Sequence, residues 1–171
     1  MADATVQTHL EIDGRRWRAS DPQLADATRQ RLVDELMDAR RAVAAANRAD
    51  DEVALAAARS RVQDAKVALG ERGPRWWEPL DDDQLAPRAE SAIVALLRTR
   101  DATSTICPTD AARVVDADHW RGRLDLVRRV AAQLHDDGVV EVRQGGEVVD
   151  DPRDVRGPLR IGRGPRFDDP R

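Results

Sequence analysis

Two apolar seams of helical spacing constrain what this chain can fold into more than any other feature. Within each seam the apolar residues recur at alternating intervals of three and four positions, which is the period of a helix that packs along one stripe. The first seam consists of Leu32, Leu36, Ala39, Val43 and Ala46, and the second of Leu55, Ala58, Val62, Ala65 and Leu69. A short polar stretch, 47–51, separates them. The sequence therefore predicts an antiparallel helical hairpin whose many alanines allow the two helices to approach closely.

Capping and breaking residues set the expected ends of this hairpin. Ser20 or Asp21 is expected to cap the first helix, with Pro22 in its first turn. Gly70 or Gly73 is expected to end the second helix, because glycine adopts the left-handed conformation that follows many helices.

A β-hairpin is expected before the helices, over residues 8–18. The pair Asp13-Gly14 lies between two short stretches that can pair, and this dipeptide is the strongest two-residue hairpin signal. The apolar contacts expected of this hairpin are Leu10, Ile12 and Trp17. Residues 1–70 are therefore predicted to form one segment, a β-hairpin followed by a helical hairpin.

Residues 71–87 have the composition of a linker. They contain three prolines, one glycine and the acidic run 81–83, which is interpreted as solvated chain. The pair Trp76-Trp77 is the exception and has two interpretations. It either folds back on the helical hairpin, or stays exposed and anchors a protein partner.

Residues 88–167 are predicted to fold as a winged helix-turn-helix, because their elements follow its order of helix, short strand, helix, turn, helix and hairpin. The elements are a helix over 90–100, an extended stretch over 103–106, a short helix over 108–115, a helix capped by Asp118 that carries Trp120, Leu124, Val127, Ala131 and Leu134, a hairpin around 144–146, and a short strand near Leu159 and Ile161. Residues 168–171 form a tail. The expected fold class is mainly helical with some strand, an α+β protein.

Several stretches carry resemblances to known families. TICPTDAARVV (105–115), the segment 127–150 and RGPLRIGRG (156–164) resemble a bacterial family of uncharacterised proteins with a winged-helix-like fold. GRRWRASDP (14–22) and VQDAKVALGERGPRWWE (62–78) resemble small, mainly actinobacterial proteins that often carry a label linking them to Tol biopolymer transport. The first resemblance implies a fold, and neither implies catalytic residues.

Composition excludes two classes of protein. No apolar run approaches the roughly 20 residues that a membrane span needs, and a single cysteine excludes a disulfide scaffold. The first ten residues have neither a basic region nor an apolar region of a secretory signal. A cytoplasmic protein with no membrane contact is expected.

Arginines in the last third of the chain suggest a nucleic-acid interface. A winged helix presents the exposed face of its third helix to the major groove and its wing to the backbone. The residues predicted to contact nucleic acid are Arg121, Arg128, Arg129, Arg143, Arg156, Arg160, Arg163 and Arg166. Asp125 and Ala132 are expected on the same helix face.

An alternative explains the same arginines as ordinary surface charge. Asp125 lies four residues from both Arg121 and Arg129, so ion pairs along a solvated face account for the helix equally well. Residues 88–171 hold 15 arginines and 15 acidic residues, which leaves no basic excess for phosphate binding.

The candidate catalytic and metal-binding residues are few. Cys107 precedes a predicted helix start, so it is either a reactive thiolate or a small residue buried at a helix entry. His9, His119 and His135 lack the spacing of a metal site. We therefore expect no metal and no cofactor. We also expect no enzymatic activity, except for a thiol-dependent activity if Cys107 is the reactive thiolate.

The N-terminal segment carries a basic set of its own, interpreted either as surface charge or as a pairing surface for a second copy of the chain. The set consists of Arg15, Arg16, Arg18, Arg40, Arg41, Lys66, Arg72 and Arg75. The sequence thus favours a non-enzymatic binding or regulatory protein that binds DNA through the winged helix. The alternative is a protein-interaction adaptor that binds a protein partner and forms a homodimer through the helical hairpin.

Overall fold

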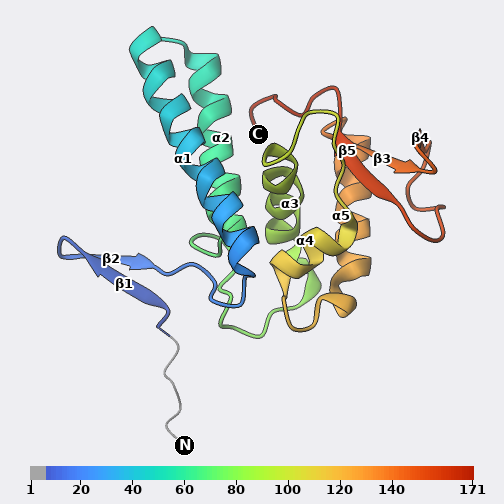
Figure 1. Ribbon diagram of the computed structural model, residues 1–171, viewed down its shortest axis with the longest axis horizontal. Helices are drawn as coiled ribbons and strands as arrows, with labels where there is room; N and C mark the ends of the chain where they lie inside the picture. The colour runs from blue at the N-terminus through green and yellow to red at the C-terminus, as the bar shows by residue number, and fades with distance from the viewer. Residues whose placement is uncertain (1–6) are drawn as a thin grey trace, which may run out of the picture.

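The two seams form the helical hairpin that their spacing predicts. In the computed structural model, which describes residues 7–171, α1 spans Asp26–Ala49 and α2 spans Glu52–Ala68. Leu32, Leu36 and Ala39 of α1 are buried in the seam. Asp51 caps α2 by accepting a hydrogen bond from the backbone of Ala54. The pair projects beyond the rest of the molecule (Figure 1).

The first helix begins later than predicted. Asp21 does not cap it, because its carboxylate turns inward, where it accepts the backbone N–H of Gln23 and pairs with Arg88. The helix starts instead at Asp26, after Ala25, without a side-chain cap. At the other end the prediction is confirmed, since Gly70 follows α2 with a φ of 83°.

The β-hairpin is confirmed, but its apolar side chains are not part of the core. β1 (His9–Ile12) and β2 (Arg15–Arg18) pair with Leu10 opposite Trp17, around a turn in which Asp13 and Gly14 both have positive φ. Leu10, Ile12 and Trp17 are 41%, 53% and 46% exposed. The hairpin projects sideways from the base of the helical hairpin (Figure 1).

The helix expected over 90–100 starts inside the predicted linker. α3 spans Asp82–Arg98 and begins with a capping box formed by Asp81 and Gln84. The acidic run is therefore a helix start and not a solvated linker, because carboxylates are stabilised by the positive end of the helix dipole. Every residue from Ser91 to Leu97 is buried.

The C-terminal elements follow the predicted order. α4 (Pro108–Val115) and α5 (Leu124–Asp136) precede a sheet in the order β4-β3-β5, formed by Glu147–Val148, Val140–Gln144 and Arg160–Arg163. Ile106 adds an isolated bridge to Ile161 of β5.

Three details of the third predicted helix are wrong. A 3-10 turn, Trp120–Arg123, replaces its first part, and Asp116 rather than Asp118 accepts the hydrogen bond from His119 N–H there. The carboxylate of Asp118 accepts instead from the side chain of Gln23. Ala132 is buried, because α5 packs against α3 and the sheet over a wider face than one stripe.

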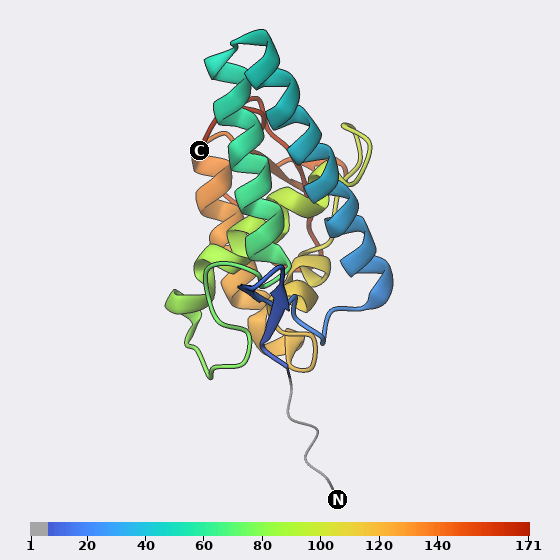
Figure 2. The same cartoon turned by 90° about the vertical axis from the view of Figure 1, so that its left-hand side faces the viewer.

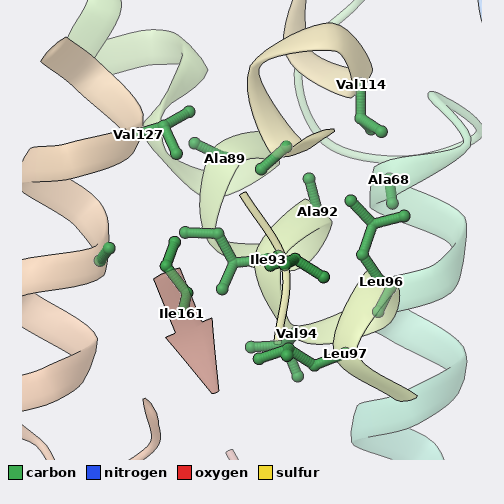
Figure 3. Close-up of a cluster of buried hydrophobic side chains, with 14 of the residues drawn as sticks. Ala68, Ala89, Ala92, Ile93, Val94, Leu96, Leu97, Val114, Val127 and Ile161 are labelled. Atoms are coloured by element: carbon green, nitrogen blue, oxygen red, sulfur yellow. The ribbon is translucent and has the colours of Figure 1, made fainter. Parts of the chain in front are cut away.

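One core joins the two halves of the chain. Seen from the side of α1 and α2, this pair covers α3 (Figure 2), while Ile93 at the centre of α3 lies between Ile161 of β5 and Ala68 of α2 (Figure 3). The predicted segments 1–70 and 88–167 therefore share a single apolar cluster, and residues 1–6 of the first lie outside the described part. The predicted mainly helical α+β class is confirmed.

Candidate binding surfaces

Most of the eight arginines predicted to contact nucleic acid are engaged in contacts within the chain, and three of them form ion pairs. Arg129 pairs with Asp83 at 3.3 Å, Arg143 with Glu141 at 2.6 Å and Arg166 with Asp169 at 3.0 Å. These carboxylates neutralise the arginines locally.

Backbone carbonyls engage three more of these arginines. Arg128 of α5 donates to the carbonyls of Val155 and Gly157, which ties the loop before β5 to the helix. Arg160 donates to Thr105, and Arg163 donates to the carbonyls of Leu97 and Arg100. These hydrogen bonds connect α5 and β5 to neighbouring segments of the C-terminal part.

Arg121 and Arg156 complete the set. The guanidinium of Arg121 lies over the ring of Trp120, 4.3 Å from its centroid. Within residues 7–171 the side chain of Arg156 makes no hydrogen bond or ion pair. Arg153, in the loop before β5, pairs with Asp136 of α5 and holds the pKa of that carboxyl below its usual value through a hydrogen bond.

Trp76 and Trp77 fold back, as the first interpretation expects, but onto the β-hairpin side of the molecule. The indole N–H of Trp76 donates to the carbonyl of Ala19 at 3.1 Å. Trp77 makes edge contacts with Trp76 and His9, at centroid distances of 5.1 and 5.5 Å, and lies beneath the guanidinium of Arg18. Both rings are half-buried, and their proposed role as a partner anchor stays a prediction.

A groove opens between the β-hairpin and the helical hairpin. It comprises a cleft of about 570 Å³ beside β1 and β2 and a hollow of about 480 Å³ along α1 and α2, and Arg40 lines both. We call this surface the hairpin groove. Its lining residues are Leu10, Ile12, Asp13, Arg15, Trp17, Arg18, Ser20, Arg40, Lys66 and Glu71 in the cleft, and Val43, Arg59, Val62, Gln63 and Arg72 in the hollow.

Lys66, the only lysine of the chain, lies at the base of this groove. Its Nζ is 3.8 Å from a carboxylate oxygen of Glu71 and 5.5 Å from the centroid of the Trp17 ring. Burial lowers the pKa of Lys66 below its ordinary value, against the opposing effect of Glu71. The ammonium therefore lies at a largely buried position with the carboxylate of Glu71 beside it.

The remaining candidate residues are dispersed. Cys107 is half-buried at the start of α4, where its thiol donates to the Thr109 hydroxyl. The proposed reactivity of this thiol stays a prediction. His135 accepts the backbone N–H of Val142, and exposed His119 lies beside Asp116. In the described part of the chain no three His, Cys, Asp or Glu side chains are grouped to hold a metal ion. No helix of residues 7–171 is both long and apolar enough to cross a membrane.

Buried ion pairs are the polar feature that sequence reasoning missed. Arg88 on α3 pairs with Asp21, and Asp64 on α2 pairs with both Arg98 and Arg171, which brings the predicted tail onto the helices. Burial raises the pKa of Asp64, against the lowering effect of these two arginines. A signal for the first pair was present, since Arg88 interrupts an apolar helix stripe next to Ala89.

Fold and surface together define a mostly helical α+β protein with a groove at its N-terminal hairpin. A family model described as a protein of unknown function (DUF3253) matches residues 86–164, which run from α3 through β5. The expected resemblance of the C-terminal half to a family of unknown function is thereby confirmed, and the resemblance expected for the N-terminal half stays a prediction. No curated protein matches the chain.

Proposed function

We propose that this protein is a non-enzymatic binding protein that holds a protein partner in the hairpin groove. The observation that carries this proposal is the exposure of Leu10, Ile12 and Trp17 on one small sheet. Exposed apolar side chains that adjoin one another mark interaction surfaces more often than isolated ones do.

The strand register explains why these three side chains act together. Leu10 is directly opposite Trp17, and Ile12 lies two residues further along β1 on the same face, since side chains alternate along a strand. All three line the cleft of the hairpin groove. A partner that buries them gains apolar contact area around an aromatic anchor, which is the usual centre of a binding surface.

The first test uses peptides displayed on phage and selected on the full chain. We expect the selected peptides to lose at least about tenfold in affinity on Trp17→Ala, because truncating an aromatic hot spot typically costs about 2 kcal/mol or more and tenfold corresponds to about 1.4 kcal/mol. Val53→Ala is the matched control, since Val53 is 73% exposed on α2 but lies outside the groove. Circular dichroism checks that both variants are folded.

Two outcomes of this selection contradict the proposal. One is the absence of any peptide enriched above background on the wild-type chain. The other is an equal effect of Trp17→Ala and Val53→Ala on the selected peptides, which would mean that the hairpin groove is not where they bind.

DNA binding is the second candidate function, and the topology of the C-terminal part supports it. The order of the bridge at Ile106, β5 and β3 is the strand order expected of a winged helix that includes α3 and α4, in which α5 would be the helix that enters the major groove. The engaged arginines count against it, because each must exchange an internal acceptor for a phosphate.

A salt series with duplex DNA measures how many arginines are free. With Arg121 and Arg156 as the only contacts, a plot of the logarithm of the binding constant against the logarithm of the salt concentration should have a slope of about −2. We expect a salt dependence no steeper than this slope. We also expect DNA binding to be lost in the double variant Arg121→Ala/Arg156→Ala. A slope of about −4 or steeper would show that the other arginines also release their internal partners.

A further inference from the structure

We propose that the occupant of the hairpin groove is an acidic amphipathic segment of another protein. Its apolar side would cover Leu10, Ile12 and Trp17, and its carboxylates would meet the basic side chains around them. This inference rests on the proposed function and deepens it by naming the chemistry of the partner.

The apolar surface is long enough for more than one anchor. Besides the cleft beside the β-hairpin there is the hollow along α1 and α2, which shares Arg40 with the cleft and contains the half-buried Val43 and Val62. A segment with apolar residues on one face can therefore contact the hairpin at one end and the helices at the other, as an amphipathic helix does in an apolar groove.

The groove is basic within an acidic protein. Six basic side chains line it against two carboxylates, Asp13 and Glu71, whereas the whole chain carries a formal charge of −4. The basic set is Arg15, Arg18, Arg40, Arg59, Lys66 and Arg72. This local excess attracts an acidic partner and repels a basic one.

The basic side chains of the groove are also less engaged than those near α5. Within residues 7–171 the side chains of Arg15, Arg40 and Arg59 form no hydrogen bond or ion pair, whereas Arg128 and Arg163 donate to internal carbonyls. Unengaged guanidinium groups can bind partner carboxylates without first breaking internal contacts, and such charge-assisted hydrogen bonds are the strong ones.

Lys66 gives the partner a defined position for one carboxylate. Its ammonium is close both to the carboxylate of Glu71 and to the Trp17 ring, and Lys66 is 8% exposed. A second carboxylate brought beside this ammonium stabilises its charged form. The same contact places the partner chain over Trp17, so the charged and apolar contacts reinforce one another.

Two other occupants fit the groove less well. Nucleic acid prefers aromatic platforms for base stacking, and the only aromatic ring in the lining is Trp17, beside aliphatic side chains such as Leu10 and Ile12. A second copy related by two-fold symmetry would place the basic rim against itself, because a two-fold interface uses the same patch on both subunits.

The test compares three peptides that differ only in charge. Each is an amphipathic helix of about 18 residues, long enough to form a helix, with Leu and Trp on one face and with Glu, Gln or Lys on the other. Each is titrated into the full chain in which lysine is labelled with carbon-13 and nitrogen-15. Because Lys66 is the only lysine, a single side-chain NMR signal reports occupancy of the groove.

We expect the Glu peptide to bind at least about tenfold more tightly than the Gln peptide, and the Lys peptide to leave the Lys66 signal unchanged. The advantage of the Glu peptide should shrink as salt is added. Binding of the Glu peptide should raise the pKa of Lys66, since an opposite charge nearby favours the protonated form.

Charge reversal in the groove provides the complementary variants. The double variant Arg40→Glu/Arg59→Glu should weaken binding of the Glu peptide at least about tenfold and should allow the Lys peptide to bind. Arg48→Glu is the control, since Arg48 lies on α1 like Arg40 but outside the groove lining. It should leave the order of affinity of the three peptides unchanged.

The outcomes separate this inference from the proposed function. If the Gln or Lys peptide binds as tightly as the Glu peptide and Trp17→Ala weakens both, the groove binds protein partners but the acidic preference is wrong. If none of the three shifts the Lys66 signal, the proposed function fails as well. A single-stranded DNA oligomer that shifts this signal more than the Glu peptide, or a shift with protein concentration alone, would overturn the inference in favour of nucleic acid or of a second copy.

Discussion

Replacement of Arg88 by methionine lowers the free energy of unfolding by about 3–5 kcal/mol, because it leaves the carboxylate of Asp21 buried without a counter-charge. Arg88 is 1% exposed, and its Nη2 lies 2.7 Å from Oδ2 of Asp21. Methionine fills a similar volume with apolar atoms, so the loss comes from the stranded charge rather than from a cavity. Urea unfolding followed by circular dichroism measures the change.

The double variant Arg88→Met/Asp21→Asn isolates that cause. It should recover most of the lost free energy, because no charge is then stranded and the asparagine oxygen still accepts from Gln23 N–H. Arg75→Ala is the matched control, since its partner Glu78 is also solvent-exposed and such pairs contribute about 1 kcal/mol or less. A double variant as unstable as Arg88→Met would contradict the electrostatic explanation.

Truncation of Ile93 to alanine is the second large effect, with an expected loss of about 2–5 kcal/mol from apolar transfer and the cavity left behind. Ile93 is 0% exposed on α3, the helix that lies between the two halves of the core (Figure 3). Val53→Ala serves here too as a control, because an exposed truncation typically changes stability by less than about 0.5 kcal/mol.

The shared core adds a qualitative expectation to the same experiment. Amide hydrogen exchange in Ile93→Ala should show protection falling together in α2 and α5, which pack on opposite sides of α3. Loss of protection in α5 alone, with α2 unchanged, would show that the two halves unfold separately despite the common core.

Local patterns made several elements predictable before the fold was known. The spacing of Leu32, Leu36 and Ala39 by four and three positions places them on one face of a helix. The Asp13-Gly14 turn needs positive φ values, which these two residues adopt readily. The order of the C-terminal helices and strands followed from spacing in the same way. Each of these depends on residues close in sequence.

Predictions failed where a distant residue decided the outcome. Asp21 is a good helix cap by local preference, but Arg88, 67 positions away, draws its side chain inward. Nothing in the sequence indicates that Arg128 and Arg163 donate to backbone carbonyls, because only the fold brings those carbonyls beside them. A guanidinium group binds the nearest good acceptor, and only the tertiary arrangement says which acceptor that is.

The candidate site follows the same division. The sequence by itself determined the helical seams, the β-hairpin and the presence of basic residues such as Arg15, Arg40 and Lys66, because residue type and short spacing suffice for these. Only the tertiary structure decided that the hairpin stands off the core with Trp17 exposed, and that these charges meet around one groove. The reason is that the groove is lined by residues up to about 60 positions apart, from Leu10 to Glu71, whose relative placement depends on core packing rather than on local preference.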